Sequence, residues 1–521
     1  MSKSQIFNPY LPSFEYVPDG EPHVFGDRIY LYGSHDRFDS AGFCLNDYVC
    51  YSADIQDLTN WKYEGIIYKK EQDPRNQNIP TDAPEQTLLF GIEPKCPEDL
   101  NPKGIHAMWA PDVVKGPDGR FYLYYCLDFL PEIGVAVCDT PAGNYEFLGL
   151  VRHKDGIALG AKDGDLLQFD PGVFIDDDGT IYLYSGNAPM ESQYANDHQG
   201  SQVMKLENDM VTLKEEPKKL MLDIMESAGS GYEGHEFFEA SSIRKINGRY
   251  YFVYSSVRSH ELCYAVSDRA DTGYQFGGTL VDIGDIFLDG RTEEQSVNHL
   301  GNTHGSIEKA GDQWYVFYHR QTNRTNFSRQ GCAEKIWLDE DGSIRQAEVT
   351  SCGLNDGPLV GSGYYPAYIC CHLTGAKGAS FSHPGSMRMD DPYLTQDGRD
   401  TEPTEELIEL DRREPLQYIK NMQNGSTAGY KYFELKHAEG VSVEIREDGE
   451  GIIEIRTNPN AGKIGEIPVC VSSQKWEKFS GDIRADDGKT ALYFVYCGAG
   501  NIDFRGFDLK AVRDGRQEKG D

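Results

Sequence analysis

The chain has 521 residues, of which 39% are hydrophobic and 12% aromatic, including 32 tyrosines. This content is enough for large cores, which excludes a disordered chain, and the length predicts two or three domains. The formal net charge of -34 excludes a typical nucleic-acid binder and disfavours an anionic membrane as partner. A neutral small molecule or sugar matches this charge better, and solubility alone also accounts for it.

The N-terminal segment has no apolar stretch of the kind found in secretion signals, and no run of 18 apolar residues offers a membrane span. The 12 cysteines are scattered, without a Cys-x-x-Cys pair, and several lie in strand-like runs. Such cysteines are typical of free, buried thiols in a reducing compartment. We therefore expect a cytoplasmic protein without a membrane partner.

One strand-turn-strand unit recurs five times in the first two thirds of the chain. Each copy has a polar residue at or near its head, a short apolar strand, a turn with glycine and an aromatic-rich second strand. The copies are DGEPHVFGDRIYLYGSHD (19–36), APDVVKGPDGRFYLYYCLD (110–128), DPGVFIDDDGTIYLYSG (170–186), EASSIRKINGRYYFVYSS (239–256) and THGSIEKAGDQWYVFYHR (303–320). Further strand-like pieces between them give four strands per unit, the size of one propeller blade. We predict an all-β fold in which residues 1–350 form a five-bladed β-propeller, with a long β-sandwich array as the alternative.

The repeat also predicts where a site would lie. If the first strand of each unit is innermost, its head residue lies at one end of the central channel, and the loop after the second strand borders the same pocket. The predicted heads are Asp19, Trp109 with Asp112, Asp170, Glu239 and His304, and the bordering loops contribute Asp36, Asp128, Asn187, Arg258 and Arg329.

Three acids and a histidine that converge on one axis are costly unless function requires them, because like charges raise one another's pKa. A glycosidic bond suits such a group: one acid protonates the leaving oxygen while a base on the opposite face activates water, about 6.5–9.5 Å away in an inverting enzyme. Ordinary interpretations exist for each residue. Asp19 and Asp170 would be turn residues, and Glu239 a surface residue. His304 would be a core histidine. Their shared position in a repeated unit favours the site.

From Asn8 to about Gly342 the chain resembles glycoside hydrolase family 43, whose catalytic domain is a five-bladed propeller. The resemblance rests on NPYLP, PDGEPHVFGDRIYLYGSHD, MWAPDVV, FDPGVFIDDDGTIYLY, FFEASSIRKINGRYYF and THGSIEKAGDQWYVFYHR. It implies Asp19 as general base, although the family's Asp-Pro pair is here Asp-Gly, which leaves Glu21 as a rival. It implies Asp170 as the acid that tunes a pKa, and Glu239 as general acid in a Glu-Ala-Ser context.

The resemblance implies further contacts with a sugar. Trp109 would form a wall of the pocket, and Arg329 would reach into the sugar subsite. His304 matches an axial histidine that often lies beside a bound calcium or an ordered water. We assign Asp112 a supporting role, and Asp36, Asn187 and Arg258 to substrate binding. No cofactor is required beyond such a structural calcium.

The implied reaction is hydrolysis with inversion by an exo-acting enzyme. The leading candidates are an α-L-arabinofuranosidase and a β-D-xylosidase that trims plant-type oligosaccharides. A β-D-galactofuranosidase is a further alternative. A catalytically silent sugar-binding propeller and a phosphorolytic enzyme are the alternatives from other classes. The chain could also form a homo-oligomer.

Residues 351–521 have a different sequence pattern. The runs KYFELKH, VSVEIRED, GIIEIRT, EIPVCVSS, ALYFVYCG and NIDFRGFDLK predict a β-sandwich or jelly roll. The closing run resembles carbohydrate-binding modules of family 6. Such a domain would bind glycan, hold a structural calcium or brace the propeller, and we favour bracing. The tail RDGRQEKGD is predicted to be disordered.

Overall fold

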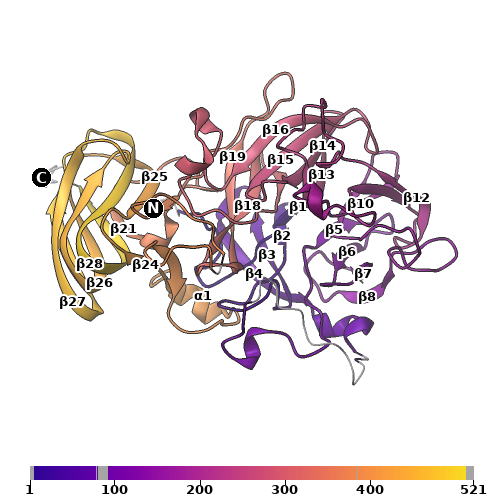
Figure 1. Ribbon diagram of the computed structural model, residues 1–521, viewed down its shortest axis with the longest axis horizontal. Coiled ribbons are helices and arrows are strands. Elements are labelled where there is room, and N and C mark those ends of the chain that lie inside the picture. Colours follow the sequence, from indigo (N-terminus) through magenta and orange to yellow (C-terminus); the bar gives the residue numbers. More distant parts are fainter. Residues whose placement is uncertain (1–4, 78, 80–91, 384, 512–521) are drawn as a thin grey trace, which may run out of the picture.

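The computed structural model describes residues 5–77, 79, 92–383 and 385–511, so the predicted disordered tail lies outside the described residues. Five antiparallel sheets surround a common axis, and a sixth sheet lies at one side of them (Figure 1). The predicted all-β fold with a five-bladed propeller is therefore confirmed. Within the described ranges, no helix has the length and apolar character needed to cross a membrane.

The strands of each blade follow one another in the chain. Blade one contains β1 (Glu21–Phe25), β2 (Arg28–Tyr32), β3 (Tyr48–Asp54) and β4 (Asp57–Tyr68), and blade two contains β5 (Asp112–Lys115), β6 (Phe121–Cys126), β7 (Ile133–Cys138) and β8 (Glu146–Leu150). Blade three contains β9 (Gly172–Ile175), β10 (Ile181–Ser185), β11 (Gln202–Leu206) and β12 (Leu213–Lys219), and blade four contains β13 (Phe237–Ile246), β14 (Arg249–Ser256), β15 (Glu261–Ser267) and β16 (Gln275–Asp282). Blade five contains β17 (Ser306–Ala310), β18 (Gln313–Thr322) and β19 (Thr325–Ile336). The first strands contact one another around the axis, which places them innermost, as expected.

Blade five has three strands, so the prediction of four strands in every unit is wrong there. After β19 the chain makes a short turn in which Leu338 pairs with Ile344, and Ala347 then pairs with Val281 of blade four. The outer edge of β19 is covered instead by a side chain. The amide of Asn8 donates to the carbonyl of Ala333 at 2.9 Å and accepts from its N–H at 3.0 Å, as a neighbouring strand would.

Aromatic residues hold neighbouring blades together. A separate hydrophobic cluster fills each of the five interfaces between blades. Tyrosines at one position of the repeat, Tyr32, Tyr124 and Tyr184, are buried and donate to carbonyls of the next blade, those of Pro141, Met210 and Ala270. In these three interfaces a ring thus packs between blades while its hydroxyl is satisfied by a backbone acceptor.

The C-terminal part forms one sheet of nine strands. They are β20 (Leu359–Val360), β21 (Gly363–Pro366), β22 (His372–Thr374), β23 (Tyr393–Gln396), β24 (Gln417–Met422), β25 (Thr427–Leu435), β26 (Ala438–Arg456), β27 (Lys463–Asp482) and β28 (Gly488–Ala511). The single described α-helix, α1 (Glu405–Asp411), precedes β24. Short 3₁₀ helices are η1 (Lys70–Gln72), η2 (Pro74–Asn76), η4 (Pro97–Asp99), η5 (Ser192–Tyr194), η6 (Leu288–Gly290), η7 (Glu293–Gln295) and η8 (Ala367–Ile369).

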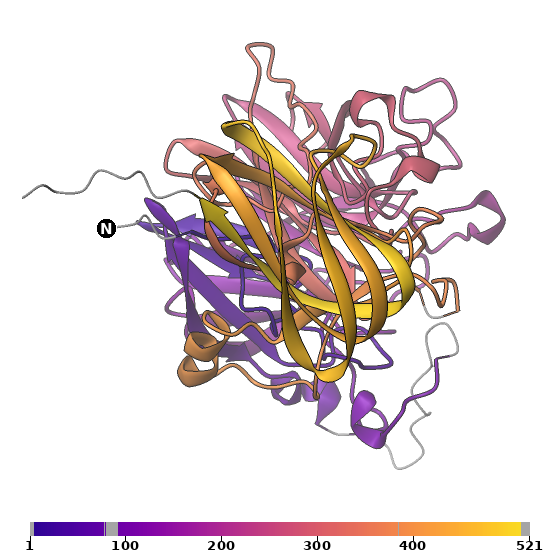
Figure 2. The ribbon, with the colours of Figure 1, turned by 90° about the vertical axis from the view of Figure 1, so that its left-hand side faces the viewer.

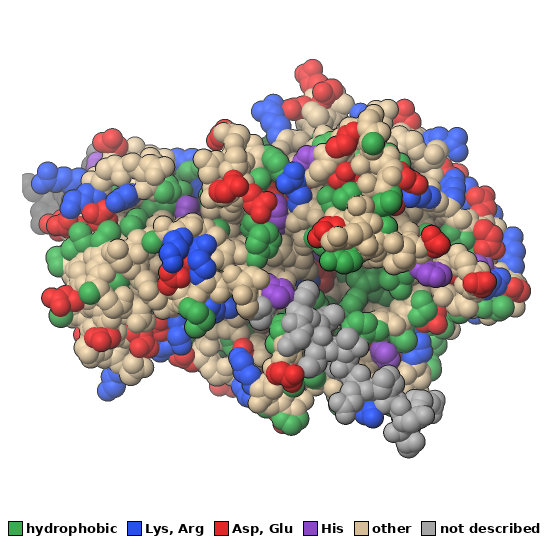
Figure 3. Space-filling view, in the orientation of Figure 1, with side chains coloured by type: hydrophobic (Ala, Val, Ile, Leu, Met, Phe, Trp, Pro, Cys, Tyr) green, Lys and Arg blue, Asp and Glu red, His purple; other side chains and the backbone are tan. Residues whose placement is uncertain are grey.

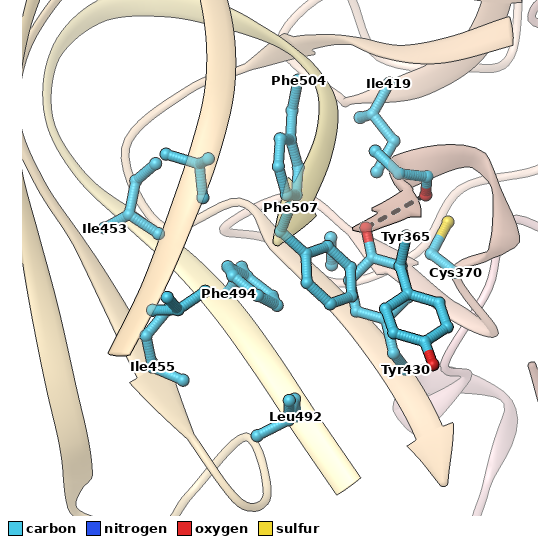
Figure 4. Close-up of a cluster of buried hydrophobic side chains, with 14 of the residues drawn as sticks. Tyr365, Cys370, Ile419, Tyr430, Ile453, Ile455, Leu492, Phe494, Phe504 and Phe507 are labelled. Carbon is cyan, nitrogen blue, oxygen red and sulfur yellow. Dashed lines mark hydrogen bonds between the residues drawn. The ribbon is translucent and has the colours of Figure 1, made fainter. Parts of the chain in front are cut away.

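Runs predicted as separate strands are single long strands in this sheet. VSVEIRED and GIIEIR both belong to β26, and ALYFVYCG and NIDFRGFDLK both belong to β28. At the middle of the pair, Gly449 lies opposite Gly500, where a Cβ on Gly500 would lie 2.0 Å from the carbonyl oxygen of Asp448. Glycine thus allows the strands to bend without ending. Phe494 and Phe507, from the two halves of β28, pack in one core with ring centroids 4.7 Å apart (Figure 4).

The C-terminal sheet is fastened to the propeller through buried polar contacts. Lys431 forms ion pairs with Asp285 of the propeller at 3.0 Å and with Glu348 at 2.9 Å. The guanidinium of Arg320 on β18 donates to the carbonyls of Tyr368 and Cys370, both at 2.7 Å. Seen from the side of this sheet, its long strands lie in front of the propeller (Figure 2). The boundary at residue 350 and the likeness to family 6 modules stay predictions.

Candidate active site

A cavity of about 250 Å³ lies where the heads of the innermost strands meet. Its wall is formed by Asp19, Phe43, Cys44, Trp109, Ala110, Phe169, Asp170, Met190, Phe238, Glu239, Ser259, Asn302, His304, Asn326 and Arg329. All five predicted head positions are therefore represented, one from each blade. On the face shown in Figure 3, acidic and basic side chains are interspersed, which is unlike the basic stripe of a nucleic-acid site.

The backbone at these heads is unusual. Asp19 has φ of 57°, Asp170 of 43°, and Ala240, which follows Glu239, of 70°. Residues other than glycine seldom adopt this left-handed region, and aspartate tolerates it better than most. Such conformations cluster at functional sites, where the surrounding structure holds them.

Asp19 is paired with a buried cation. Arg329 Nη1 lies 2.8 Å from Asp19 Oδ1, and the rest of the guanidinium makes two contacts of 2.9 Å with Asp36. Burial opposes the charge on Asp19, but the Arg329 guanidinium prevails and holds the pKa of this carboxyl well below its usual range. Asp19 is therefore ionised at neutral pH.

Asp36 was predicted to bind substrate, and its placement corrects this. Its side chain is fully buried, it is absent from the cavity wall, and its oxygens accept hydrogen bonds from Arg329 and from the amide of Cys44. Asp36 therefore positions Arg329, since a carboxylate matches the fork of a guanidinium.

Glu239 and Asp170 have the opposite electrostatic environment. Asp170 is buried and Glu239 is partly buried, and the loss of solvent raises the pKa of each. The neighbouring negative charge raises both further: Asp19 acts on Glu239, and Glu239 and then Asp19 act on Asp170. Asn187 does not line the cavity but donates to Glu239 Oε2 at 3.3 Å, so it supports this carboxyl from behind. The cavity thus combines an ionised carboxylate with carboxyl groups that favour the protonated form.

His304 lies between two of the acids. Its Nδ1 is 4.0 Å from Asp19 Oδ1 and 3.5 Å from Asp170 Oδ2. Burial lowers its pKa to about 4, against the attraction of Asp19, so the ring is neutral at pH 7. Calcium prefers six to eight oxygen ligands. Asp19 is already compensated by Arg329, and among the described residues no group of three ligating side chains close enough to share an ion includes His304. These residues do not fit a protein-held calcium.

A second histidine was missed from the sequence. His319 is fully buried at the end of β18, where its Nδ1 accepts from the amide of Asp19 at 3.2 Å and its Nε2 donates to the carbonyl of Asn302 at 2.9 Å. It therefore fixes the backbone that presents Asp19. Its position near the end of β18, the second strand of the fifth repeated unit, was the available signal.

Glu21, the rival of Asp19, lies away from the cavity. It forms an ion pair with Arg244 at 2.9 Å and accepts from Ser242 at 2.9 Å. Asp112 lies near it, hydrogen-bonded to His23 at 2.7 Å and to the amide of Val173 in blade three at 2.6 Å. These contacts give both acids a place in the packing of the inner strands, and for Asp112 this is the supporting position that was expected.

Arg258 is directed away from the cavity, which corrects its predicted place at the pocket. Its Nε donates to the carbonyl of Gly234 at 2.8 Å, and its guanidinium lies 5.1 Å from the ring centre of Phe287. The neighbouring Ser259 lines the cavity instead. Asp128, also predicted at the border, accepts from the amide of Ala107 at 2.9 Å and so holds the loop before Trp109.

Apolar side chains complete the wall. Trp109 makes edge contacts with Phe169 at 5.1 Å and Phe129 at 6.0 Å between ring centres. Phe169 and Phe238 each precede a predicted acid, so the phenylalanine before the head residue was a usable signal. Met190 lies in the connection between β10 and β11, and Asn326 lies in an irregular part of β19. The repeat gave no signal for either residue.

A family model described as glycosyl hydrolases family 43 matches residues 91–344. A xylosidase/arabinosidase of Thermoclostridium stercorarium is 46% identical over 510 residues, which cover 97% of this chain and 99% of that protein. A β-xylosidase of Xylanibacter ruminicola is 29% identical over 360 residues, 64% of this chain and 98% of that protein. An arabinoxylan arabinofuranohydrolase of Paenibacillus polymyxa is 28% identical over 538 residues, 95% of this chain and 71% of that protein.

Proposed function

Because the chain belongs to glycosyl hydrolases family 43 and is thus a glycoside hydrolase, we propose an inverting exo-glycosidase that releases terminal α-L-arabinofuranose or β-D-xylose. The substrate would be a plant-type oligosaccharide. The names of the relatives, xylosidase/arabinosidase and arabinoxylan arabinofuranohydrolase, support these two sugars. The 12 free cysteines support the proposal of a reducing, cytoplasmic location.

The observation that carries the proposal is the split in ionisation between Asp19 and Glu239. Arg329 holds the pKa of Asp19 down, so this carboxylate is available to accept a proton from water. Burial and the charge of Asp19 raise the pKa of Glu239, so its proton is available for the leaving oxygen. Asp170 contributes a neighbouring carboxyl coupled to Glu239, the role of an acid that tunes the donor. Each proton transfer supplies about 10²–10⁴-fold in rate.

The cavity favours removal of a single terminal sugar. Its volume of about 250 Å³ is below the roughly 300–1,000 Å³ of pockets for drug-sized ligands. Trp109, Phe169 and Phe238 give it an apolar wall against which a sugar ring can pack. A cavity of this kind suits exo action better than binding within a long chain.

Two alternatives are less well supported. A sugar-binding propeller without activity does not need carboxyl groups with opposite protonation in one cavity. A phosphorolytic enzyme needs a free cation for phosphate. Arg329 is engaged by two carboxylates, and Arg258 lies outside the cavity wall.

The test is a panel of nitrophenyl glycosides with and without phosphate: α-L-arabinofuranoside, β-D-xyloside, β-D-galactofuranoside and β-D-glucoside as the control. We expect phosphate-independent release from one or both of the first two. Proton NMR of the sugar released from an oligosaccharide should show the inverted anomer first. Failure to cleave any member would contradict the proposal, strict phosphate dependence would favour phosphorolysis, and preference for the galactofuranoside would change the sugar assigned.

A further inference from the structure

An irregularity in β19 turns a side chain toward the cavity. Gln321 of β18 pairs with Arg329, but the next residue, Thr322, pairs with Thr325, so residues 326–328 leave the ladder. Bulges of this kind re-aim side chains and are common beside active sites. As a result, Asn326 and Arg329 both line the cavity.

The bulge is held firmly. Phe327 is fully buried and packs edge-on against Phe43, with ring centres 4.7 Å apart. Ser328 Oγ accepts from the amide of Asp39 at 3.1 Å, and the Ser328 carbonyl accepts from Thr322 at 2.6 Å. Contacts made by Phe327 and Ser328, inside the bulge, therefore fix the position of the segment that carries Asn326.

Asn326 lines the cavity and has an unused hydrogen-bonding atom. Its Oδ1 is buried and has no partner among the described residues. The same is true of Trp109 Nε1, which belongs to the same cavity. Several other polar groups of the wall do have partners: Asp19 pairs with Arg329, Glu239 with Asn187, and Asn302 Oδ1 with Gln321 at 3.0 Å.

A buried polar atom without a partner destabilises the protein that contains it, and native proteins rarely keep one without a reason. Among the described residues of the cavity wall, one acceptor, Asn326 Oδ1, and one donor, Trp109 Nε1, are thus buried without a partner. A sugar hydroxyl both donates and accepts a hydrogen bond, so it can satisfy atoms of either kind.

We infer that Asn326 is a specificity-determining residue whose Oδ1 accepts a hydrogen bond from one ring hydroxyl of the terminal sugar, with Trp109 Nε1–H donating to a hydroxyl oxygen. This inference rests on the proposed function, because it concerns the same cavity. A sugar without the partner hydroxyl leaves Asn326 unpaired in the complex. Sites that lose a buried hydrogen bond in this way discriminate more strongly than apolar pockets do.

The test compares Asn326→Leu and Asn326→Asp with the unaltered protein. The substrates are the nitrophenyl pentoside that it cleaves best and the monodeoxy analogues of that pentoside. We expect Asn326→Leu to lower kcat/KM on the parent substrate by about 5- to 150-fold. For the unaltered protein, kcat/KM on one of the analogues should be lower than on the parent substrate by a similar factor. For Asn326→Leu, kcat/KM on that analogue and on the parent substrate should be nearly equal. Asn326→Asp keeps an acceptor oxygen, so it should still discriminate against that analogue.

Stability separates this role from a structural one. Asn326→Leu removes an unpaired polar atom, so the thermal midpoint without ligand should be unchanged or higher, while protection by the released sugar should weaken. Asn101→Leu is the matched control, because Asn101 Nδ2 is also buried and unpartnered but lies outside the cavity wall; it should leave discrimination among the analogues unchanged.

Unaltered discrimination in Asn326→Leu would overturn the inference, and so would a lowered midpoint with equal losses on every analogue. If the unaltered protein cleaves no glycoside of the panel, the proposed function fails instead. The two failures are therefore distinguishable.

Discussion

Asp19 and Glu239 line one cavity, and their surroundings give them opposite protonation. Asp19 accepts a hydrogen bond from the Arg329 guanidinium at 2.8 Å, whereas Glu239 accepts one from the neutral amide of Asn187 at 3.3 Å. Asp19 is buried and Glu239 is partly buried, and desolvation acts on the pKa of both in the same direction. The difference in charge of the partner decides which of them carries the proton.

Substitutions at these two acids should be told apart by the leaving group. Nitrophenolate leaves with little protonation, so Glu239→Gln should lose less kcat on a nitrophenyl glycoside than the loss of about 10²–10⁴-fold expected on an oligosaccharide. Asp19→Asn removes the base and should lose a similar factor on both substrates. Steady-state kinetics on the two substrate types measures this, with Asp118→Asn at an exposed turn as the control. Equal losses for Glu239→Gln on both substrates would contradict its role as the acid.

The pKa of Glu239 also predicts how stability depends on pH. Because burial and the charge of Asp19 raise this pKa above its ordinary 4.5, the folded protein keeps the proton at pH values where the unfolded chain has lost it. Stability from this group is therefore lost as pH rises past 4.5 toward the folded-state pKa. Glu239→Gln does not titrate, so its thermal midpoint should exceed that of the unaltered protein in mildly alkaline buffer, with the difference shrinking toward pH 4.5.

Thermal scans at a fixed rate check this prediction, and Glu477→Gln on the exposed part of β27 is the control. A difference that is the same at every pH would show that the substitution acts through packing and not through the proton.

At the scale of single elements, blade five depends on a side chain where other blades have a strand. Asn8 pairs with both backbone groups of Ala333, and its amide also donates to Glu334 Oε1 at 2.8 Å. The N-terminal segment therefore closes the edge of the last sheet, an arrangement that protects unpaired strand groups.

Asn8→Ala should destabilise the protein by about 1–3 kcal/mol, because buried backbone groups of β19 lose their partners. The measurement is the midpoint of thermal unfolding, together with activity of the protein that remains folded. Asn208→Ala, at an exposed position before β12, is the matched control and should have little effect. A normal midpoint for Asn8→Ala would mean that the edge of β19 is held by other contacts.

At the scale of the whole molecule, the junction between propeller and C-terminal sheet is built from buried ions. Lys431 is 5% exposed at its side chain and Asp285 is fully buried. Burial raises the pKa of Asp285 even though Lys431 lies beside it, so the pair is maintained against a desolvation cost. Breaking one partner should affect both parts of the chain, as expected of a domain that braces the propeller.

Lys431→Met should therefore destabilise the protein by up to about 3–5 kcal/mol, because it leaves the buried Asp285 with a more distant cation, Arg291 at 3.8 Å. Adding Asp285→Asn should restore part of this loss, since it removes the buried charge. Urea or thermal unfolding of the two single variants and the double variant measures the coupling. Additive losses would show that the contact does not join the two parts energetically.

The amino-acid sequence determined the blades and the heads of the strands. The hairpin signals recur once in each blade, so the residues at the heads of the first strands occupy equivalent positions and reach one cavity. These residues are Asp19, Trp109, Asp170, Glu239 and His304. This followed from local pattern alone, because a repeated unit places the same position at the same end of the channel.

Only the tertiary structure decided how those residues are held and what surrounds them. Arg258 turns away, His319 supports the backbone of Asp19, and Asn326 enters through a bulge. The tertiary structure also decided that blade five ends with its third strand and that β26 and β28 are each one long strand. The physical reason is that side-chain direction, strand continuity and pKa depend on partners distant in the chain, such as Arg329 beside Asp19, which local periodicity does not encode.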